Sequence, residues 1–308
     1  MTNITDDNIK IQQAEKFYIS FLKYTQSVFT SITDIGALDI DSVAEKIRIL
    51  WNEVRYNRRF LLYTRPCVEP LINENYLASH SVRSAVIAMI IGVHLKLPNH
   101  RLVELGIATL LHDIGMLRLP PETYLKNLDL TESEKRKIYT HPVHGYKMLM
   151  KLKFPLSIRL GVLDHHEREN GSGYPRKLKE GNISLYGRII AVACSYEALS
   201  AKRQYKKAKD DNTGIMELLQ NENKQYNDTV VKALATALSF YPIGTFVLLS
   251  DGNQGQVFDV NPLSHLHHAV RLLEPENKEE KTIVWTSDKG VSIVRPLTRE
   301  EIDHEKAQ

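Results

Sequence analysis

The expected fold and chemistry of this chain depend on residues 165–175, which read HHERENGSGYP. Two adjacent histidines end a segment with helical periodicity, and the glycines that follow permit a sharp turn. Adjacent side chains on an ideal helix point roughly 100° apart, so the two imidazoles suit two neighbouring metal ions, or one ion beyond the helix end. The stretch therefore predicts a site for several metal ions beside a phosphate-handling loop.

Three more histidines and an aspartate lie upstream, each near an end of a segment with helical periodicity. They are His80, His112, Asp113 and His141. A lone histidine on an apolar helix is more often a core or surface residue than a ligand, so the prediction depends on the whole set. Neutral imidazoles with one carboxylate suit iron, manganese, zinc or nickel better than magnesium or calcium. We therefore expect a transition-metal centre.

The number of candidate ligands favours two metal ions over one. Five histidines and one aspartate exceed the needs of a tetrahedral zinc, but they suit two ions about 3.5–4 Å apart. Asp113 is the natural bridge because a carboxylate has two coordinating oxygens. Such a pair of ions can activate water and stabilise the charge of an attacked phosphodiester. The residues alone predict a metal-dependent phosphohydrolase.

The composition is that of a globular protein without a nucleic-acid or membrane signature. The chain has 308 residues, of which 43% are hydrophobic and 25% charged, and its net charge is +3. Lys and Arg are scattered, so no DNA or RNA partner is expected. The longest apolar run, residues 85–93, is far shorter than the roughly 20 residues of a membrane span, and no secretory signal is visible. We expect a cytoplasmic protein without a disulfide, since Cys67 and Cys194 lack a paired spacing.

The hydrophobic pattern predicts a mainly α-helical chain with an N-terminal helical region (residues 1–70), a helical core (71–242) and a small β-rich tail (243–308). The first region holds two helices with a break at residues 34–39. Their aromatic faces suit packing within the chain, with a homodimer or sensor surface as the alternative. Core helices are expected at residues 77–97, 101–112, 131–152, 156–166, 184–201 and 210–240, and strands at 245–249, 256–260, 269–273, 282–286 and 291–294.

Four motifs in order carry a family resemblance. They are His112-Asp113-Ile114-Gly115, His141-Pro142 followed by Gly145, His165-His166-Glu167, and Gly173-Tyr174-Pro175. Together they resemble the motifs of the HD-GYP family, a branch of the HD superfamily of metal-dependent phosphohydrolases, over residues 71–241. The resemblance implies an HD-type helical bundle that hydrolyses cyclic di-GMP to pGpG or GMP. It also implies two or three metal ions, with iron expected and manganese, zinc or nickel as alternatives.

The resemblance also assigns roles to single residues. The matching metal ligands are His80, His112, Asp113, His141, His165 and His166, with His112 and Asp113 as the catalytic pair. Gly173, Tyr174 and Pro175 match the loop that borders the substrate. Arg203 and Lys206 match the basic residues that contact its phosphate and guanine; a planar guanidinium suits phosphate oxygens or a guanine edge.

This chain departs from the family at the lysine that usually follows the His-Asp motif, because Met116 stands there. Arg118 is no easy substitute, since residues two apart on a continuing helix do not share a face. Loss of one preorganised charge typically costs about 10²–10³ in rate. The departure favours slow catalysis.

Three further departures concern the metal shell. Cys194 stands where the family has a metal-binding aspartate; it is either a thiolate ligand or a small buried cysteine. Glu197 replaces a second family aspartate. Tyr76 stands where members with three metals have a glutamate, so two metals are expected and Tyr76 is interpreted as a core aromatic.

Other residues are given lesser roles. Glu167 is expected to support a histidine or contact the ligand rather than bind metal. His144 is expected at the surface. A cluster of histidines in the β-rich tail is expected in an exposed turn, and its members are His265, His267 and His268.

Three functional hypotheses follow from the sequence. The leading one is a cyclic di-GMP phosphodiesterase with two metals and reduced activity. The second is a cyclic di-GMP receptor or scaffold without useful catalysis, favoured by Met116 and Cys194. The third is an HD-superfamily enzyme that acts on another nucleotide, or a diiron oxygenase, since the superfamily contains both.

Overall fold

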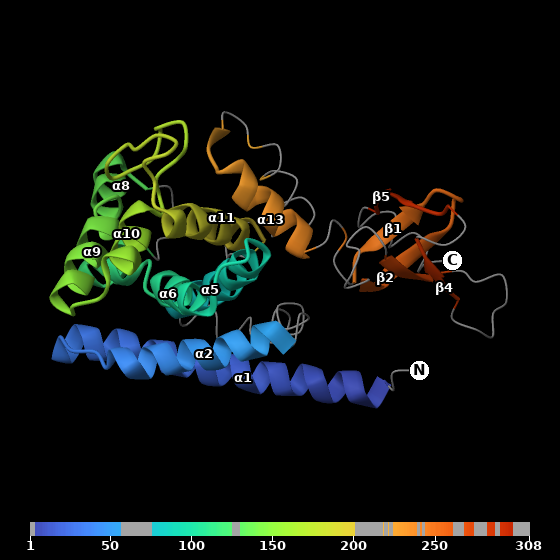
Figure 1. Ribbon diagram of the computed structural model, residues 1–308, viewed down its shortest axis with the longest axis horizontal. Coiled ribbons are helices and arrows are strands. Elements are labelled where there is room, and N and C mark those ends of the chain that lie inside the picture. The colour runs from blue at the N-terminus through green and yellow to red at the C-terminus, as the bar shows by residue number, and fades with distance from the viewer. Residues whose placement is uncertain are drawn as a thin grey trace. The chain divides into compact units, whose positions relative to one another are not determined.

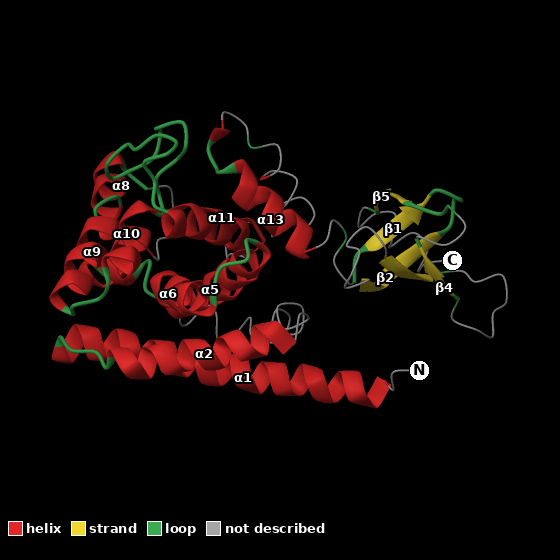
Figure 2. Ribbon diagram, viewed as in Figure 1, coloured by secondary structure: helices red, strands yellow, loops and turns green. Residues whose placement is uncertain are grey.

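A computed structural model of the chain is shown in Figure 1. The structure describes residues 4–56, 76–124, 130–200, 218, 221, 224–238, 241, 244–260, 268–273, 282–286 and 290–297. It divides into two compact units: a helical unit with the N-terminal helices and the core, and a smaller unit with the strands. Figure 2 makes the split between helices and strands plain. The expected mainly α-helical fold with a C-terminal β tail is confirmed.

Two long helices open the chain. α1 (Ile4–Thr30) continues into the short π-helical segment η1 (Ser31–Ile35), which ends at Gly36 with a positive φ of 68°. α2 (Ile40–Tyr56) follows, and Asp39 Oδ1 accepts a hydrogen bond from the Ser42 backbone N–H at 3.1 Å. Glycine tolerates the left-handed conformation and aspartate satisfies the first exposed N–H groups of a helix. The expected break at residues 34–39 is confirmed.

The apolar faces of α1 and α2 are buried within the helical unit. Val43, Ile47 and Leu50 of α2 are fully buried, and a Cβ added to Gly106 of the core would lie 2.6 Å from Ile47 Cγ2. Tyr18 of α1 is 1% exposed, and its hydroxyl lies 3.1 Å from Ser79 Oγ. The N-terminal faces therefore pack within the chain, as expected.

The core consists of five of the described helices, which are α5 (Tyr76–His94), α6 (Asn99–Leu110), α9 (His141–Lys151), α10 (Leu156–Asp164) and α11 (Leu185–Ser200). In this core α6 and α11 pack against α5, and α10 packs against α6, α9 and α11. α5 is long and apolar enough to cross a membrane by length and composition, but 78% of its most apolar window is buried inside the protein. An apolar helix enclosed by its neighbours is typical of a protein core.

The single helix expected at residues 131–152 is wrong, because the structure has two. α8 (Glu132–Ile138) begins with a capping box in which Thr131 and Glu134 exchange hydrogen bonds, and α9 begins at His141. Proline inside a helix clashes with the carbonyl four residues earlier, so Pro142 is incompatible with a helix that continues from Ile138. Because Pro142 has no N–H to donate, the Ile138 carbonyl can accept a hydrogen bond from another group.

Two other local expectations also need correction. The helix expected at residues 210–240 is interrupted, since Asn221 and Lys224 have positive φ values, and α13 (Asp228–Leu238) begins after them. The segment after Asp113 is the 3₁₀ helix η2 (Ile114–Arg118), followed by the short α7 (Pro121–Tyr124). A positive φ is incompatible with a continuing right-handed helix, which explains the interruption at Asn221 and Lys224.

The β unit is one antiparallel sheet with strand order β4-β3-β2-β1-β5. Its strands are β1 (Phe246–Leu249), β2 (Gln254–Val260), β3 (His268–Leu272), β4 (Ile283–Trp285) and β5 (Ile293–Pro296). The prediction that His268 lies in an exposed turn is wrong, because His268 is 2% exposed. It begins β3 opposite Val260, with its ring against Tyr241. His265 and His267 lie outside the described residues.

Candidate metal centre

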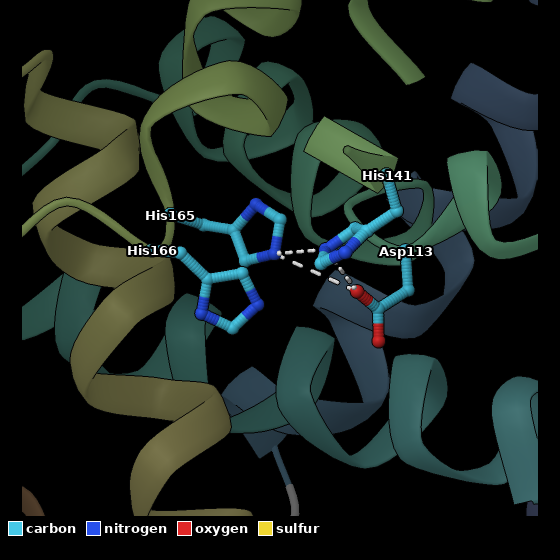
Figure 3. A group of neighbouring side chains, drawn as sticks. All are labelled: Asp113, His141, His165 and His166. Atoms are coloured by element: carbon cyan, nitrogen blue, oxygen red, sulfur yellow. Dashed lines mark hydrogen bonds and ion pairs between the residues drawn. The ribbon is translucent and has the colours of Figure 1, made fainter. Parts of the chain in front are cut away.

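Helix ends bring the six candidate ligands together. His80 is on the first turns of α5, His112 and Asp113 follow α6, His141 begins α9, and His165 and His166 follow α10. Their ligand atoms form two groups that share Asp113: one with His80 and His112, the other with His141, His165 and His166. Figure 3 shows the second group, in which dashed lines join the rings of His141 and His165 to each other and to one carboxylate oxygen of Asp113.

Asp113 directs one carboxylate oxygen toward each group. Its Oδ1 lies 3.1 Å from His141 Nε2 and 3.5 Å from His165 Nε2. Its Oδ2 lies 3.5 Å from His112 Nε2 and 3.8 Å from His80 Nε2. A carboxylate placed between two sets of imidazole nitrogens has the geometry of a bridge between two cations.

Backbone carbonyls fix the orientation of three of these rings. The Nδ1 atoms of His112, His141 and His165 each lie 2.7 Å from the carbonyl oxygen three residues earlier in the chain. A carbonyl can only accept, so each Nδ1–H donates and each neutral ring keeps its Nε2 lone pair. For His141 the acceptor is the Ile138 carbonyl that the break before α9 sets free. All three lone pairs face the centre.

His80 is oriented by a carboxylate rather than a carbonyl. Its Nδ1 donates to Glu197 Oε2, and the other oxygen of Glu197 forms an ion pair with Arg83 Nη2 at 3.1 Å. Glu197 is 3% exposed, so this ion pair is buried. A carboxylate that holds a metal-binding histidine fixes its tautomer and increases its basicity. Glu197 therefore acts through His80, on the side of the ring away from Asp113.

The nitrogen and oxygen atoms gathered at this centre are suited to bind cations. His112 Nε2 lies 3.3 Å from His80 Nε2, and His141 Nε2 lies 3.2 Å from His165 Nε2, so lone pairs face each other. Asp113 Oδ1 is buried without a hydrogen-bond donor. Burial lowers the pKa of His112 to about 3, so protonation does not relieve the repulsion at neutral pH. A buried carboxylate oxygen without a donor requires another positive partner, and imidazole with carboxylate suits divalent transition metals.

Replacement of Glu197 by glutamine is expected to lower metal affinity by about 10–100-fold, because His80 loses its charged support. Thermal stability should also fall, since Arg83 would keep a buried charge without its counter-charge. The matched control is Glu45→Gln, which breaks an exposed pair with Arg48 (3.2 Å) and should change neither quantity measurably. Metal titration and thermal unfolding measure both effects. Unchanged metal affinity in Glu197→Gln would contradict this role.

The loop of residues 171–178 is anchored to the centre by Glu167. One Glu167 oxygen accepts from the Arg176 backbone N–H at 2.6 Å and the other from Leu178 N–H at 2.8 Å. A Cβ on Gly173 would lie 2.4 Å from the His166 carbonyl oxygen, so only glycine permits this close approach. Both Glu167 oxygens thus accept hydrogen bonds from the backbone of this loop, and Glu167 holds the loop in place.

The same loop places Tyr174 and Pro175 beside the candidate metal centre. The Tyr174 ring stacks on His166 at a centroid distance of 4.6 Å and an interplanar angle of 20°. Its backbone N–H donates to the His166 carbonyl at 3.1 Å, and the bond between Tyr174 and Pro175 is cis. The loop therefore covers one face of a candidate metal ligand.

The structure also places the residues that depart from the family pattern. Cys194 is a free thiol, 6% exposed, with its Sγ 3.6 Å from the Ala191 carbonyl, and it belongs to neither ligand group. Burial raises its pKa to about 12, which favours the thiol. Tyr76 stacks on His80 at 5.8 Å. Met116 is partly buried in η2, whereas Arg118 is exposed.

The remaining residues near the site are of two kinds: those that the sequence predicted and those that it did not. His144, partly buried in α9, belongs to neither ligand group. Arg203 and Lys206 lie outside the described residues. Arg83 was missed from the sequence, although its position three residues after His80 places both on one helix face. Arg168 was also missed; its guanidinium lies 4.9 Å from the Tyr226 ring and lowers the pKa of His166 as a minor contribution beside burial.

Residues 66–231 match the family described as HD domain, which is more than half of the chain. This chain belongs to the HD domain family. Within that family its ordered motifs and relatives confirm the HD-GYP resemblance. The HD domain chain is similar in fold to Bd1817, an HDG"Y"P protein from Bdellovibrio bacteriovorus, with a TM-score of 0.58 and 16% identity over 73% of this chain and 71% of that one.

Curated relatives of this HD domain chain are named as phosphodiesterases. It is 31% identical over 239 residues to cyclic di-GMP phosphodiesterase PdeB of Borreliella burgdorferi, covering 76% of this chain and 63% of PdeB. It is 32% identical over 207 residues to cyclic di-GMP phosphodiesterase PA4108 of Pseudomonas aeruginosa, covering 67% and 48%. It is 33% identical over 167 residues to 3'3'-cGAMP-specific phosphodiesterase 3 of Vibrio cholerae, covering 54% and 36%. The chain thus spans less than two thirds of each of these relatives.

Proposed function

We propose that this chain is a metal-dependent phosphodiesterase that hydrolyses cyclic di-GMP to pGpG or GMP in the cytoplasm. The observation that carries the proposal is Asp113, which faces two groups of imidazole nitrogens with one carboxylate oxygen each. The names of the relatives support the substrate. We propose two divalent transition metals, with iron expected and manganese, zinc or nickel as alternatives, and no DNA, RNA or membrane partner. A homodimer through the N-terminal helices stays a prediction.

The residues of the centre have distinct proposed roles. When bound, two such ions would supply an activated water and positive charge for the attacked phosphate. Asp113 would hold both ions at a fixed separation, and His112, His141 and His165 present lone pairs already oriented by backbone carbonyls. Such preorganisation avoids a reorganisation cost when the reaction occurs. Tyr174, Gly173 and Pro175 would border the substrate, and we propose Arg203 and Lys206 as contacts for its phosphate and guanine.

The proposal is tested with protein that is loaded with metal under anaerobic conditions. Iron, manganese, nickel and zinc are compared, and cyclic di-GMP, 3'3'-cGAMP and linear pGpG are offered side by side. We expect cyclic di-GMP to be converted to pGpG or GMP with at least one metal. No turnover with any metal at full metal content would refute catalysis, and faster turnover of a linear substrate would favour an enzyme for another nucleotide.

A cyclic di-GMP receptor or scaffold is the second candidate, and Met116 is the observation that favours it. If the missing lysine limits catalysis, Met116→Lys is expected to raise kcat by about 10²–10³-fold while the affinity for cyclic di-GMP changes little. Leu117→Lys is the matched control, since it adds the same charge at the next position of η2. Steady-state kinetics measure the effect. A kcat that is unchanged in Met116→Lys would mean that another residue limits the rate.

A further inference from the structure

Three aromatic rings form a stack that begins at the metal centre and ends at the surface. His166 stacks on Tyr174 at 4.6 Å and 20°, and Tyr174 stacks on Tyr139 at 4.1 Å and 18°. The outermost ring, Tyr139, is 47% exposed. We call these three residues the ring stack. It connects a candidate metal ligand to solvent through nearly parallel aromatic planes.

The exposed end of the ring stack does not belong to the protein core. Tyr139 is the residue at the C-terminal cap of α8, a helix without buried residues. Burial of apolar surface contributes roughly 25 cal/mol per Å², so a tyrosine that is half exposed contributes far less to folding than a buried one such as Tyr18. Tyr139 is therefore a ring held parallel to the loop tyrosine at a position where about half of it is exposed to solvent.

The surroundings of Tyr139 suit an anionic ligand with a planar aromatic group. Arg136 and Lys137 are exposed in the same last turn of α8. Proteins that bind nucleotides without reading their sequence combine positive charge with aromatic rings on which bases stack. The ring stack starts at His166, where the cleaved phosphate would lie, so it leads outward to where a base of the same nucleotide would lie.

We propose that Tyr139 is a stacking platform for a purine base of the cyclic dinucleotide that is cleaved at the metal centre. The inference rests on the proposed function and adds a substrate-binding residue that also determines specificity. A purine presents a larger ring surface than a pyrimidine, so the platform favours purine cyclic dinucleotides. Tyr174 forms the inner side of the platform and Tyr139 extends it beyond the loop.

Tyr139 could instead act only as a brace for Tyr174, and the two roles give different results. A brace affects every ligand of the centre, including one without a base. A platform affects only ligands that carry a base, and it affects a purine more than a pyrimidine. Inorganic phosphate is the probe without a base, and cyclic di-UMP is the pyrimidine probe.

The experiment uses the full chain loaded with metal. The bis-phosphorothioate analogue of cyclic di-GMP, which resists hydrolysis, is titrated by calorimetry into wild type, Tyr139→Ala, Tyr139→Phe and the control Tyr146→Ala. Tyr146 is a tyrosine of α9 whose ring lies against Arg159, outside the ring stack. Inhibition by inorganic phosphate and the ratio of kcat/KM for cyclic di-GMP over cyclic di-UMP are measured on the same proteins.

We expect Tyr139→Ala to weaken binding of the analogue by about 5–150-fold, the range of one base–aromatic stack, with KM raised more than kcat is lowered. The preference for cyclic di-GMP over cyclic di-UMP should shrink, and Tyr139→Phe should restore wild-type values. Wild-type binding and preference in Tyr139→Ala would overturn the proposal, as would an equal loss of phosphate inhibition. If wild type neither binds nor cleaves cyclic di-GMP, the proposed function fails; if it binds without cleavage and Tyr139 matters, the receptor hypothesis and the platform both stand.

Discussion

Asp113→Asn is expected to lower kcat by at least about 10²–10³-fold and to reduce the bound metal below two ions per chain. Asparagine has one neutral oxygen and an amide N–H₂ group, so it cannot offer an anionic oxygen to both groups of imidazoles. Bound metal stabilises the folded state by mass action, so the rise in melting temperature on metal addition should also shrink. Metal analysis, steady-state kinetics and thermal unfolding measure the three effects.

The same substitution should not destabilise the metal-free protein. Asp113 Oδ1 is buried without a donor, and the asparagine amide can donate to His141 Nε2, 3.1 Å from that oxygen in the wild type. Asp41→Asn, at the exposed start of α2, is the matched control and should retain wild-type metal content. A two-metal enzyme with wild-type kcat in Asp113→Asn would rule out Asp113 as the bridge.

Gly115→Ala is expected to separate η2 from α9 and to abolish two-metal binding. A Cβ at residue 115 would lie 2.0 Å from the His141 carbonyl oxygen and 2.7 Å from the Gly145 nitrogen. Both are backbone atoms, so the helix that carries His141 must move away from Asp113. Overpacking of this kind typically costs about 1–3 kcal/mol in stability and sometimes more. Thermal unfolding and metal stoichiometry test both consequences.

Gly106→Ala is the control that distinguishes a general loss of stability from a specific loss of metal binding. Its Cβ would meet only side-chain atoms, Ile47 Cγ2 at 2.6 Å and the Met89 sulfur at 3.3 Å. We expect this variant to lose stability but to bind two metals once folded, whereas Gly115→Ala loses metal even when folded. Equal metal content in the two variants would show that the contact between η2 and α9 does not set the geometry of the centre.

Features that depend on residues close together in the sequence could be predicted. Gly36 and Asp39 mark the end of one helix and the start of the next, because each residue type satisfies a specific backbone requirement. The candidate ligands were predicted because they combine rare residue types with positions at helix ends, where separate segments can meet. Pro142 carries a local signal of the same kind for the break before α9, because proline is favoured in the first turn of a helix and not in its interior. The prediction of one helix at residues 131–152 does not take this signal into account.

Features that depend on distant contacts could not be predicted. The bond between His80 and Glu197 joins residues 117 positions apart, so no local pattern indicates it. The sequence identified Glu197 only as a change from the family aspartate, and its pairing with Arg83 depends on how α11 packs against α5. Burial of His268 depends likewise on the register of β3 against β2. Arg203 and Lys206 remain predictions.

The hydrogen bond between Tyr18 and Ser79 has a consequence for the modularity of this protein. It joins α1 to the residue immediately before His80, and burial raises the pKa of Tyr18 to about 12, so the hydroxyl keeps its proton. A different N-terminal module would therefore have to reproduce both the apolar surface of α1 and α2 and the hydrogen bond to Ser79. Exchange of the N-terminal region by recombination is thus constrained, and we expect its sequence to evolve together with that of α5.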